Sequence, residues 1–239
     1  MFHPQGPTFY ELAVQALSST RRGYDLLAPK FDHTPFRTPD WLLNLVGDYL
    51  QTLTPFDSGL DLCCGTGAGV ALLRPLCRSR VVGLDFSQGM LEVCRKHVPD
   101  MPGSAAVELV RADALAMPFG AAFDVVVCFG AFGHILERDE PRFVAEVARV
   151  LRPGGRFVFV TASMPPVTSP GYWIARAFNA AMHLRNFLIR PPFIMYYLTF
   201  LLPRARRLLE RAGLVVEERP LALERPLRNL RLVVATRPA

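Results

Sequence analysis

The feature that most constrains the fold is the stretch 60–69, Leu-Asp-Leu-Cys-Cys-Gly-Thr-Gly-Ala-Gly. A short apolar strand leads there into a glycine-rich turn and then into a helix. Glycine lacks a Cβ and accepts backbone angles that other residues avoid, so backbone amides in such a turn can approach a ligand closely. The unpaired amides of the following helix point to the same place. The stretch predicts a ligand-binding turn, but phosphate loops, dinucleotide folds, adenosyl-cofactor folds and purely structural turns all share it.

The sequence after residue 58 predicts a parallel sheet covered by helices. Apolar segments of strand length alternate there with segments of helix length, which is typical of α/β folds. The expected strands are 59–63, 80–85, 107–110, 123–129, 156–161, 214–218 and 230–236. The expected helices between them are 68–77, 87–97, 140–151 and 204–212. The third of these should stop at the proline and glycines of 152–155.

Two segments fall outside this alternation. Before it, helices are expected at 8–20 and 39–50, with Thr8 and Thr38 as caps and a turn-rich stretch between them. After the strand 156–161, residues 164–203 hold eight aromatic residues and many prolines. Two short helices are expected in that segment, at 172–188 and 193–202. The whole chain, 1–239, should form a single domain.

Charge and cysteine content exclude several classes of protein. The net charge of +6 arises because residues 147–209 contain nine arginines and no acid. A basic face attracts nucleic acid, anionic lipid or acidic substrates, but 25 arginines against two lysines indicate a codon bias, so we expect no nucleic-acid partner. The five cysteines lack metal-ligand spacing, so we expect no metal site and free thiols in the cytoplasm. No signal peptide and no membrane-spanning helix are expected.

Three acids follow successive strands. Asp85 lies 20 residues after Gly65, where an acid can bind both ribose hydroxyls of an adenosine ligand or can simply cap a helix. Asp113 can reach an adenine amine or can be an ordinary loop acid. Asp61 stands directly before the glycines and would repel a phosphate group but attract a cation. Because Gly-Lys-Ser/Thr is absent, a nucleoside-triphosphate loop is excluded.

Four ordered stretches carry a family resemblance. They are Leu-Asp-Leu-Cys-Cys-Gly-Thr-Gly, Val-Val-Gly-Leu-Asp-Phe-Ser-Gln-Gly-Met-Leu, Arg-Ala-Asp-Ala-Leu-Ala-Met-Pro-Phe and Leu-Arg-Pro-Gly-Gly. Together they resemble the class I S-adenosylmethionine-dependent methyltransferases, most closely the group with the menaquinone and ubiquinone C-methyltransferases. The likeness covers about residues 20–162 and includes Tyr24-Asp25 and Phe31-Asp32. Cys63 departs from it, since it replaces the usual first glycine of the turn.

The resemblance implies a Rossmann-like, doubly wound sheet of seven strands in the order 3-2-1-4-5-7-6, with the last strand antiparallel. A helical N-terminal segment and a helical lid insertion would complete this α/β fold. We therefore divide the chain into an N-terminal helical cap (1–50), a cofactor-binding core (51–162), a hydrophobic substrate lid (163–203) and a closing helix with a strand pair (204–239).

The resemblance also implies the cofactor S-adenosylmethionine, with S-adenosylhomocysteine as product, and a role for each site residue. The turn with Asp61, Cys63, Gly65 and Gly67 would hold the methionine part and Asp85 the ribose. The other expected cofactor contacts are Phe86 and Met90 on the adenine faces, Asp113 and Ala114 at the adenine edge, Phe129 and Gly130 beside the sulfonium, and Tyr24 as a cover.

Catalysis requires a base only if the acceptor loses a proton, because the methyl group is already activated. His134 lies five residues beyond Phe129 and is the best candidate, although it can equally be a structural histidine; His33 and His183 are weaker candidates. The aromatic composition of the lid indicates a lipophilic acceptor. Its expected contacts are Tyr172, Trp173, Phe193, Tyr196 and Tyr197.

These features predict methyl transfer to an oxygen or carbon of a quinone-like, aromatic or polyketide-like small molecule. Alternatives are an RNA or protein methyltransferase and an inactive cofactor-binding partner protein. Enzymes that methylate exocyclic amines place Asn/Asp-Pro-Pro-Tyr after the fourth strand, whereas residues 129–132 are Phe-Gly-Ala-Phe. Aromatic residues with arginines are also typical of a peripheral membrane contact, and a monomer and a homodimer both remain open.

Overall fold

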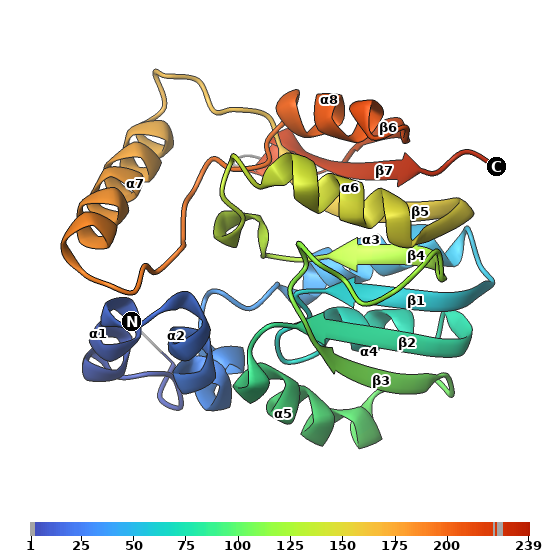
Figure 1. Cartoon of the computed structure of the whole chain (residues 1–239), viewed down its shortest axis with the longest axis horizontal. Coiled ribbons are helices and arrows are strands. Elements are labelled where there is room, and N and C mark those ends of the chain that lie inside the picture. Colours follow the sequence, from blue (N-terminus) through green and yellow to red (C-terminus); the bar gives the residue numbers. More distant parts are fainter. Residues whose placement is uncertain (1–2, 222, 224–226) are drawn as a thin grey trace.

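A computed structural model describes residues 3–221, 223 and 227–239, so the first two residues of the expected cap and four residues between the two closing strands lie outside the described residues. Its centre is a seven-stranded sheet in the order β3-β2-β1-β4-β5-β7-β6 (Figure 1). β7 runs antiparallel to both of its neighbours, β5 and β6, which confirms the expected topology. The strands are β1 (Phe56–Leu62), β2 (Cys77–Asp85), β3 (Ala106–Arg111), β4 (Phe123–Cys128), β5 (Leu151–Ala162), β6 (Val215–Pro220) and β7 (Leu230–Thr236).

Helices cover both faces of this sheet. The helices of the described residues, not all of which cover the sheet, are α1 (Phe9–Leu17), α2 (Thr20–Leu27), α3 (Asp40–Gln51), α4 (Ala68–Leu73), α5 (Gln88–His97), α6 (Glu140–Val150), α7 (Pro170–Leu188) and α8 (Arg204–Arg211). Short 3₁₀-helices form η1 (Ala28–His33), η2 (Val98–Asp100), η3 (Phe132–His134) and η4 (Leu227–Asn229). Figure 1 shows α6 and α8 in front of the sheet and α3 and α4 behind it.

The core lies in two layers, one on each face of the sheet. Side chains alternate between the faces along a strand, so Val126 packs with α6 and α8, whereas Val125 and Val127 pack with α3, α4 and α5. This explains why β4 is apolar except at Asp124, as expected for a central strand buried on both faces.

Several predicted boundaries were wrong. The stretch after residue 20 is helical, because the Ser19 hydroxyl accepts a hydrogen bond from the Arg22 amide and starts α2. Helix α4 ends at Leu73, since Cys77 already belongs to β2. Helix α6 ends at Val150, and the proline and glycines of 152–155 lie within β5. Thr38 does not cap α3; Pro39 occupies the N-cap position without a side-chain hydrogen bond.

The predicted helix at 193–202 does not form. The backbone amides of this segment bond to groups elsewhere in the chain and so are not available for an i→i−4 ladder. Four of these bonds run from the amides of Phe193, Tyr196, Tyr197 and Phe200 to Asn186 Oδ1, the Gly133 carbonyl, Asn179 Oδ1 and Glu140 Oε1, respectively. The segment therefore crosses the molecule as an irregular strap, which we call the 193–202 strap.

No helix within the described ranges combines the length and the apolarity that crossing a membrane requires.

The end of the strap is fixed by Phe200, whose ring is buried among Phe132, Phe143 and Phe159 at centroid distances of 4.7, 5.9 and 5.5 Å. We expect Phe200→Ala to lower the free energy of unfolding by about 3–5 kcal/mol, because it opens a cavity in the aromatic core. The matched variant Phe187→Ala alters a ring that is 79% exposed. It should change stability by less than about 0.5 kcal/mol in the same urea titration. Equal losses for both variants would contradict this packing.

Candidate functional site

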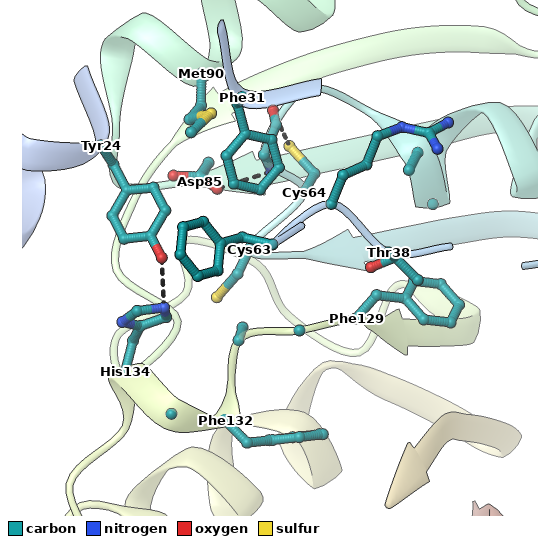
Figure 2. Close-up of a pocket in the computed structure, with 18 of the residues that line it drawn as sticks. Tyr24, Phe31, Thr38, Cys63, Cys64, Asp85, Met90, Phe129, Phe132 and His134 are labelled. Atoms are coloured by element: carbon teal, nitrogen blue, oxygen red, sulfur yellow. Dashed lines mark hydrogen bonds between the residues drawn. The ribbon is translucent and has the colours of Figure 1, made fainter. Parts of the chain in front are cut away.

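A cavity of about 460 Å³ opens at the carboxyl ends of β1, β2 and β4 (Figure 2). The turn after β1 forms its floor, and α2, η1 and the strap complete its walls. In open α/β sheets, ligands bind at the carboxyl ends of the strands, at the point where the strand order changes direction. Here that point lies between β1 and β4. The position of the cavity therefore follows directly from the topology of the sheet.

Asp61 is the buried, second-last residue of β1, and it faces the start of α4. A Cβ on Gly69 would lie 2.5 Å from the Asp61 carboxylate, so glycine is required for the helix to approach the acid this closely. Asp61 Oδ2 has no hydrogen-bond partner, and no other buried side-chain oxygen or nitrogen in the described part of the chain is left so. Burial raises the pKa of Asp61 to about 8, although the amides of Val70 and Gly69 oppose this. A donor or a cation in the cavity would satisfy this oxygen.

Asp85 ends β2 and connects two segments of the cavity floor. Its Oδ2 accepts a hydrogen bond from the Gly65 amide at 2.9 Å, and its Oδ1 accepts one from the Ser87 amide at 2.8 Å. Each oxygen keeps a further acceptor site. Burial raises the pKa of Asp85, and the amide of Ser87 is the main opposing influence. Phe86 follows on the cavity wall. Met90 also lies on that wall, and its backbone amide donates a hydrogen bond to the Ser87 hydroxyl.

The turn itself uses left-handed backbone angles at Cys63, Gly65 and Gly67, with φ of 56°, 52° and 99°. This explains why a glycine is usual at the position of Cys63, since other residues are strained there. The Cys128 thiol and burial hold the pKa of Cys63 well above its usual value, so the thiol stays protonated. Gly67 lies off the main cavity; a Cβ there would meet Cys94 Sγ at 2.5 Å.

Two acids hold the N-terminal segment over the turn. Asp25 accepts hydrogen bonds from the Ser87 hydroxyl at 2.6 Å and the Gly89 amide at 2.9 Å. Asp32 accepts one from the Thr66 hydroxyl at 2.6 Å. These contacts give a structural reason for the Tyr-Asp and Phe-Asp pairs noted in the sequence.

Tyr24, placed by this arrangement, forms a pair with His134. The Tyr24 hydroxyl lies 2.7 Å from His134 Nε2, and His134 Nδ1 lies 2.6 Å from the Ile194 carbonyl (Figure 2). A carbonyl only accepts, so Nδ1 carries the proton and Nε2 accepts the hydroxyl hydrogen of Tyr24. Burial lowers the pKa of His134 and raises that of Tyr24. Both groups are therefore neutral near pH 7, and both ring nitrogens are engaged.

The structure brings most of the expected site residues to this cavity. Those on its wall are Tyr24, Asp61, Cys63, Gly65, Asp85, Phe86, Met90, Phe129, Gly130, His134, Tyr196 and Tyr197. Phe193 lies one layer behind, stacked on Tyr24 with centroids 6.4 Å apart. His33 stacks on His3, and His183 lies against Tyr196, so both are away from the wall.

Besides Gly67 and Phe193, four expected residues lie off the cavity wall. Asp113 and Ala114 are absent from the cavity wall, and the exposed Asp113 carboxylate accepts the Leu115 amide at 2.9 Å. Tyr172 and Trp173 are also off the wall, because α7 turns Trp173 outward until it is 62% exposed. Its indole donates to the Val167 carbonyl at 2.8 Å. In this structure Tyr172 and Trp173 therefore do not line the expected acceptor pocket, and Asp113 and Ala114 do not line the part of the cavity expected to hold adenine.

Part of the wall comes from residues that no motif indicates. They belong to four distant segments and meet only in the folded chain: Phe36 and Leu42; Val160; Met195 and Leu198; and Leu230. Spacing along the sequence carries no signal for such a set. The cavity therefore has an acidic half around Asp61 and Asp85 and an apolar half around Phe132, Val160 and Leu198. The first suits a cation with hydroxyl groups, and the second suits an apolar molecule.

Comparison with known proteins agrees with this geometry. Residues 60–159 match the family model described as a methyltransferase domain. Demethylmenaquinone methyltransferase of Symbiobacterium thermophilum is 38% identical over 116 residues, which cover 46% of this chain and 45% of that protein. Phthiotriol/phenolphthiotriol dimycocerosates methyltransferase of Mycobacterium leprae is 39% identical over 116 residues, covering 48% and 40%. The matched region is thus less than half the length of these curated relatives.

Solved structures share the fold at low sequence identity. An O-methyltransferase family protein from Burkholderia thailandensis has a TM-score of 0.67 at 18% identity, covering 91% of this chain and 60% of that one. Magnesium protoporphyrin IX methyltransferase from Synechocystis PCC 6803, solved with bound S-adenosylhomocysteine, has a TM-score of 0.60 at 16% identity and covers 82% of both chains. These likenesses support the architecture.

The unpartnered Asp61 carboxylate predicts a pH-dependent stability. Because its pKa is about 8 in the folded protein and 3.8 ordinarily, the protonated form favours folding. That contribution is complete below the ordinary pKa and is lost as the pH rises through 8. Between roughly pH 5 and pH 8, the loss of this contribution should lower the free energy of unfolding of the ligand-free protein by about 1 kcal/mol for each unit by which the pH rises.

Urea titrations across this range test the prediction. Asp61→Asn removes the titration and keeps the shape of the side chain, so its stability should depend less on pH than that of the wild type. Asp113→Asn, which removes an exposed carboxyl group at a neighbouring strand end, serves as the matched control. Parallel pH profiles for wild type and Asp61→Asn would show that Asp61 has no raised pKa.

Proposed function

We propose that this chain is a class I S-adenosylmethionine-dependent methyltransferase and that it transfers a methyl group to an oxygen or carbon of a neutral, lipophilic small molecule. The observation that carries the proposal is a single cavity with two chemically different halves. The acidic half adjoins the glycine turn, and the apolar half contains no carboxylate. The cofactor and the acceptor would therefore meet near Phe129 and Gly130.

The residues present fit S-adenosylmethionine. The unpartnered Asp61 Oδ2 suits its ammonium group, and the remaining acceptor sites of Asp85 suit its ribose hydroxyls. Phe86 and Met90 supply apolar faces for the adenine ring. We keep Asp113 and Ala114 at the adenine edge as a proposal that requires the loop after β3 to contact the ligand. When bound, the cofactor supplies a methyl group already activated on a sulfonium.

The chain's own contribution is chiefly alignment and exclusion of water. Alignment alone can contribute roughly 7–11 kcal/mol to lowering a bimolecular barrier. In this proposal, residues 163–203 act as the substrate lid, and the strap supplies its inner surface with Met195, Tyr196 and Leu198. These side chains would hold the acceptor against the floor without offering it a charge.

The proton of a hydroxyl acceptor would leave through Tyr24. His134 Nε2 already accepts the Tyr24 hydrogen, so His134 cannot take a proton from the acceptor directly. Instead, the acceptor hydroxyl would give its proton to the Tyr24 oxygen while Tyr24 gives its own to His134 Nε2. The Ile194 carbonyl holds the opposite N–H during this transfer. His134 is then the final proton acceptor and Tyr24 the group that contacts the acceptor.

The names of the relatives support an apolar acceptor. The demethylmenaquinone and the phthiotriol/phenolphthiotriol dimycocerosates methyltransferases are both named for lipophilic molecules. The wall of the cavity has the same character in this chain, since it includes Phe36, Leu42 and Leu230. We therefore place a quinol or phenol with an apolar substituent first among candidate acceptors.

Transfer of a labelled methyl group tests the proposal. The protein is incubated with methyl-labelled S-adenosylmethionine and either a reduced alkyl-naphthoquinol or its sulfonated analogue. We expect labelled product from the alkyl compound and at least about tenfold less from the sulfonated one, because burying the sulfonate unpaired is costly. Label transferred only to RNA or protein would contradict the proposal. Cofactor binding without transfer to any of these acceptors would favour an inactive binding protein.

The Tyr24–His134 pair generates a separate prediction. Tyr24→Phe and His134→Ala should each reduce kcat about 10²–10⁴-fold for a hydroxyl acceptor, since each interrupts the same proton route. The double variant Tyr24→Phe/His134→Ala should be no slower than the slower single variant. Multiplicative losses in the double variant would show that the two residues do not act together.

His183→Ala is the matched control for the histidine, because His183 touches Tyr196 from outside the cavity wall. It should keep kcat within about threefold of the wild type. The affinity for S-adenosylhomocysteine, measured by calorimetry, distinguishes loss of the proton route from loss of the cofactor site, and it should change little in His134→Ala.

A further inference from the structure

The outward face of α7 is apolar, and its inward face is polar. No residue of this 19-residue helix is buried. On the inward side, Asn179 exchanges two hydrogen bonds of 2.8 Å with the backbone of Tyr197, and Asn186 bonds the backbone of Phe193. Outward, Ile174 is 70% exposed and Phe187 79%, with Trp173, Leu184 and Leu188 also exposed. This is the reverse of the usual orientation of a helix on a water-soluble protein.

Helix α1 carries further exposed apolar side chains at the same end of the molecule. Arg185 joins the two helices, because its guanidinium donates to the Ala16 and Ser18 carbonyls, each at 2.8 Å. Helix α1 adds the exposed side chains of Phe9, Tyr10 and Leu17. Figure 1 shows α7 and α1 at the same end of the molecule, away from the sheet. We call the exposed apolar side chains of these two helices the α1–α7 face.

Exposed arginines without ion pairs among the described residues lie on and beside the helices of this face, and the one acid of α1 is already paired. Arg21 and Arg22 begin α2 beside α1, Arg176 lies on α7, and Arg190 follows it; all four are exposed, and none is in an ion pair with a described residue. Helix α7 contains no acid. The acid of α1, Glu11, is paired with Lys30 at 2.7 Å. A partner of this face must therefore offer an apolar layer and negative charge together.

We propose that the α1–α7 face docks onto the surface of an anionic lipid bilayer. Trp173, Ile174 and Phe187 would enter the boundary between headgroups and acyl chains, and the four arginines would contact the lipid phosphates and carboxylates. A helix lying in the membrane plane has this combination of apolar and basic side chains. The inference goes beyond the proposed reaction and does not depend on it.

A second copy of the chain fits the same face less well. Symmetric pairing would bring the exposed arginines of two copies together without an acid to neutralise them, and like charges at an interface oppose association. A bilayer with anionic headgroups supplies the missing charge. Docking would also hold α7 directly outside the strap, whose Tyr196 and Tyr197 line the cavity. A lipophilic molecule would then have a short path from the acyl chains to the apolar half.

Co-sedimentation with vesicles tests the proposal on the full chain. The probes are vesicles of pure phosphatidylcholine and vesicles containing phosphatidylglycerol. We expect binding mainly to the anionic vesicles, with release at high salt. Ile174→Gln/Phe187→Gln should weaken partitioning at least about tenfold through lost apolar insertion. Arg176→Gln and Arg190→Gln should each weaken it about fivefold.

Matched controls lie at the opposite end of the molecule. Val215 on β6 is also exposed and apolar, and Arg211 on α8 is also exposed, so Val215→Thr and Arg211→Gln should bind like the wild type. Circular dichroism checks that every variant is folded. Wild-type protein that does not bind anionic vesicles, or controls that lose as much binding as the α7 variants, would overturn the proposal. Dimerisation that depends on Ile174 and Phe187 without vesicle binding would assign the face to a second copy.

Discussion

The cavity depends on one close contact, between the buried carboxylate of Asp61 and the first turn of α4. Only glycine at position 69 permits it, because a Cβ would lie 2.5 Å from the carboxylate. The contact requires the sharp left-handed turn at 63–67. A hydrogen bond from the Gly65 amide to the Asp85 carboxylate holds this turn to β2. What remains is an acid without a partner at the base of a cavity. The ammonium group of the proposed cofactor would supply the hydrogen-bond donor and the positive charge that this acid lacks.

Much of the sheet could be predicted from the sequence, because alternation of strand and helix patterns reports burial directly. The final strand was predicted with the same bounds, 230–236, that the structure has. The strand order, by contrast, followed from the family resemblance and is confirmed by the sheet. Helix α2 was missed since its start depends on the Ser19 hydroxyl, a single local bond within a stretch that otherwise has the composition of a turn.

The site was predictable where one motif contains its residues and unpredictable where distant segments meet. Asp61, Gly65 and Asp85 could be assigned to one cavity from their spacing. Trp173 could not be placed correctly, because apolar side chains are expected to face inward. The orientation of α7 is set instead by Asn179 and Asn186, whose bonds to the strap turn the aromatic face outward. The same bonds displace the helix expected at 193–202, so both errors have one physical cause.

Proton exchange on cofactor binding tests the role of Asp61 most directly. At pH 7, the empty protein should hold Asp61 protonated, since its pKa is about 8, and a bound ammonium group should drive the proton off. Calorimetric titration with S-adenosylmethionine, in two buffers of different ionisation enthalpy, measures the number of protons that binding releases. We predict release of about one proton by the wild type and almost none by Asp61→Asn, which should also bind more weakly. Equal proton exchange and equal affinity in both proteins would contradict the account.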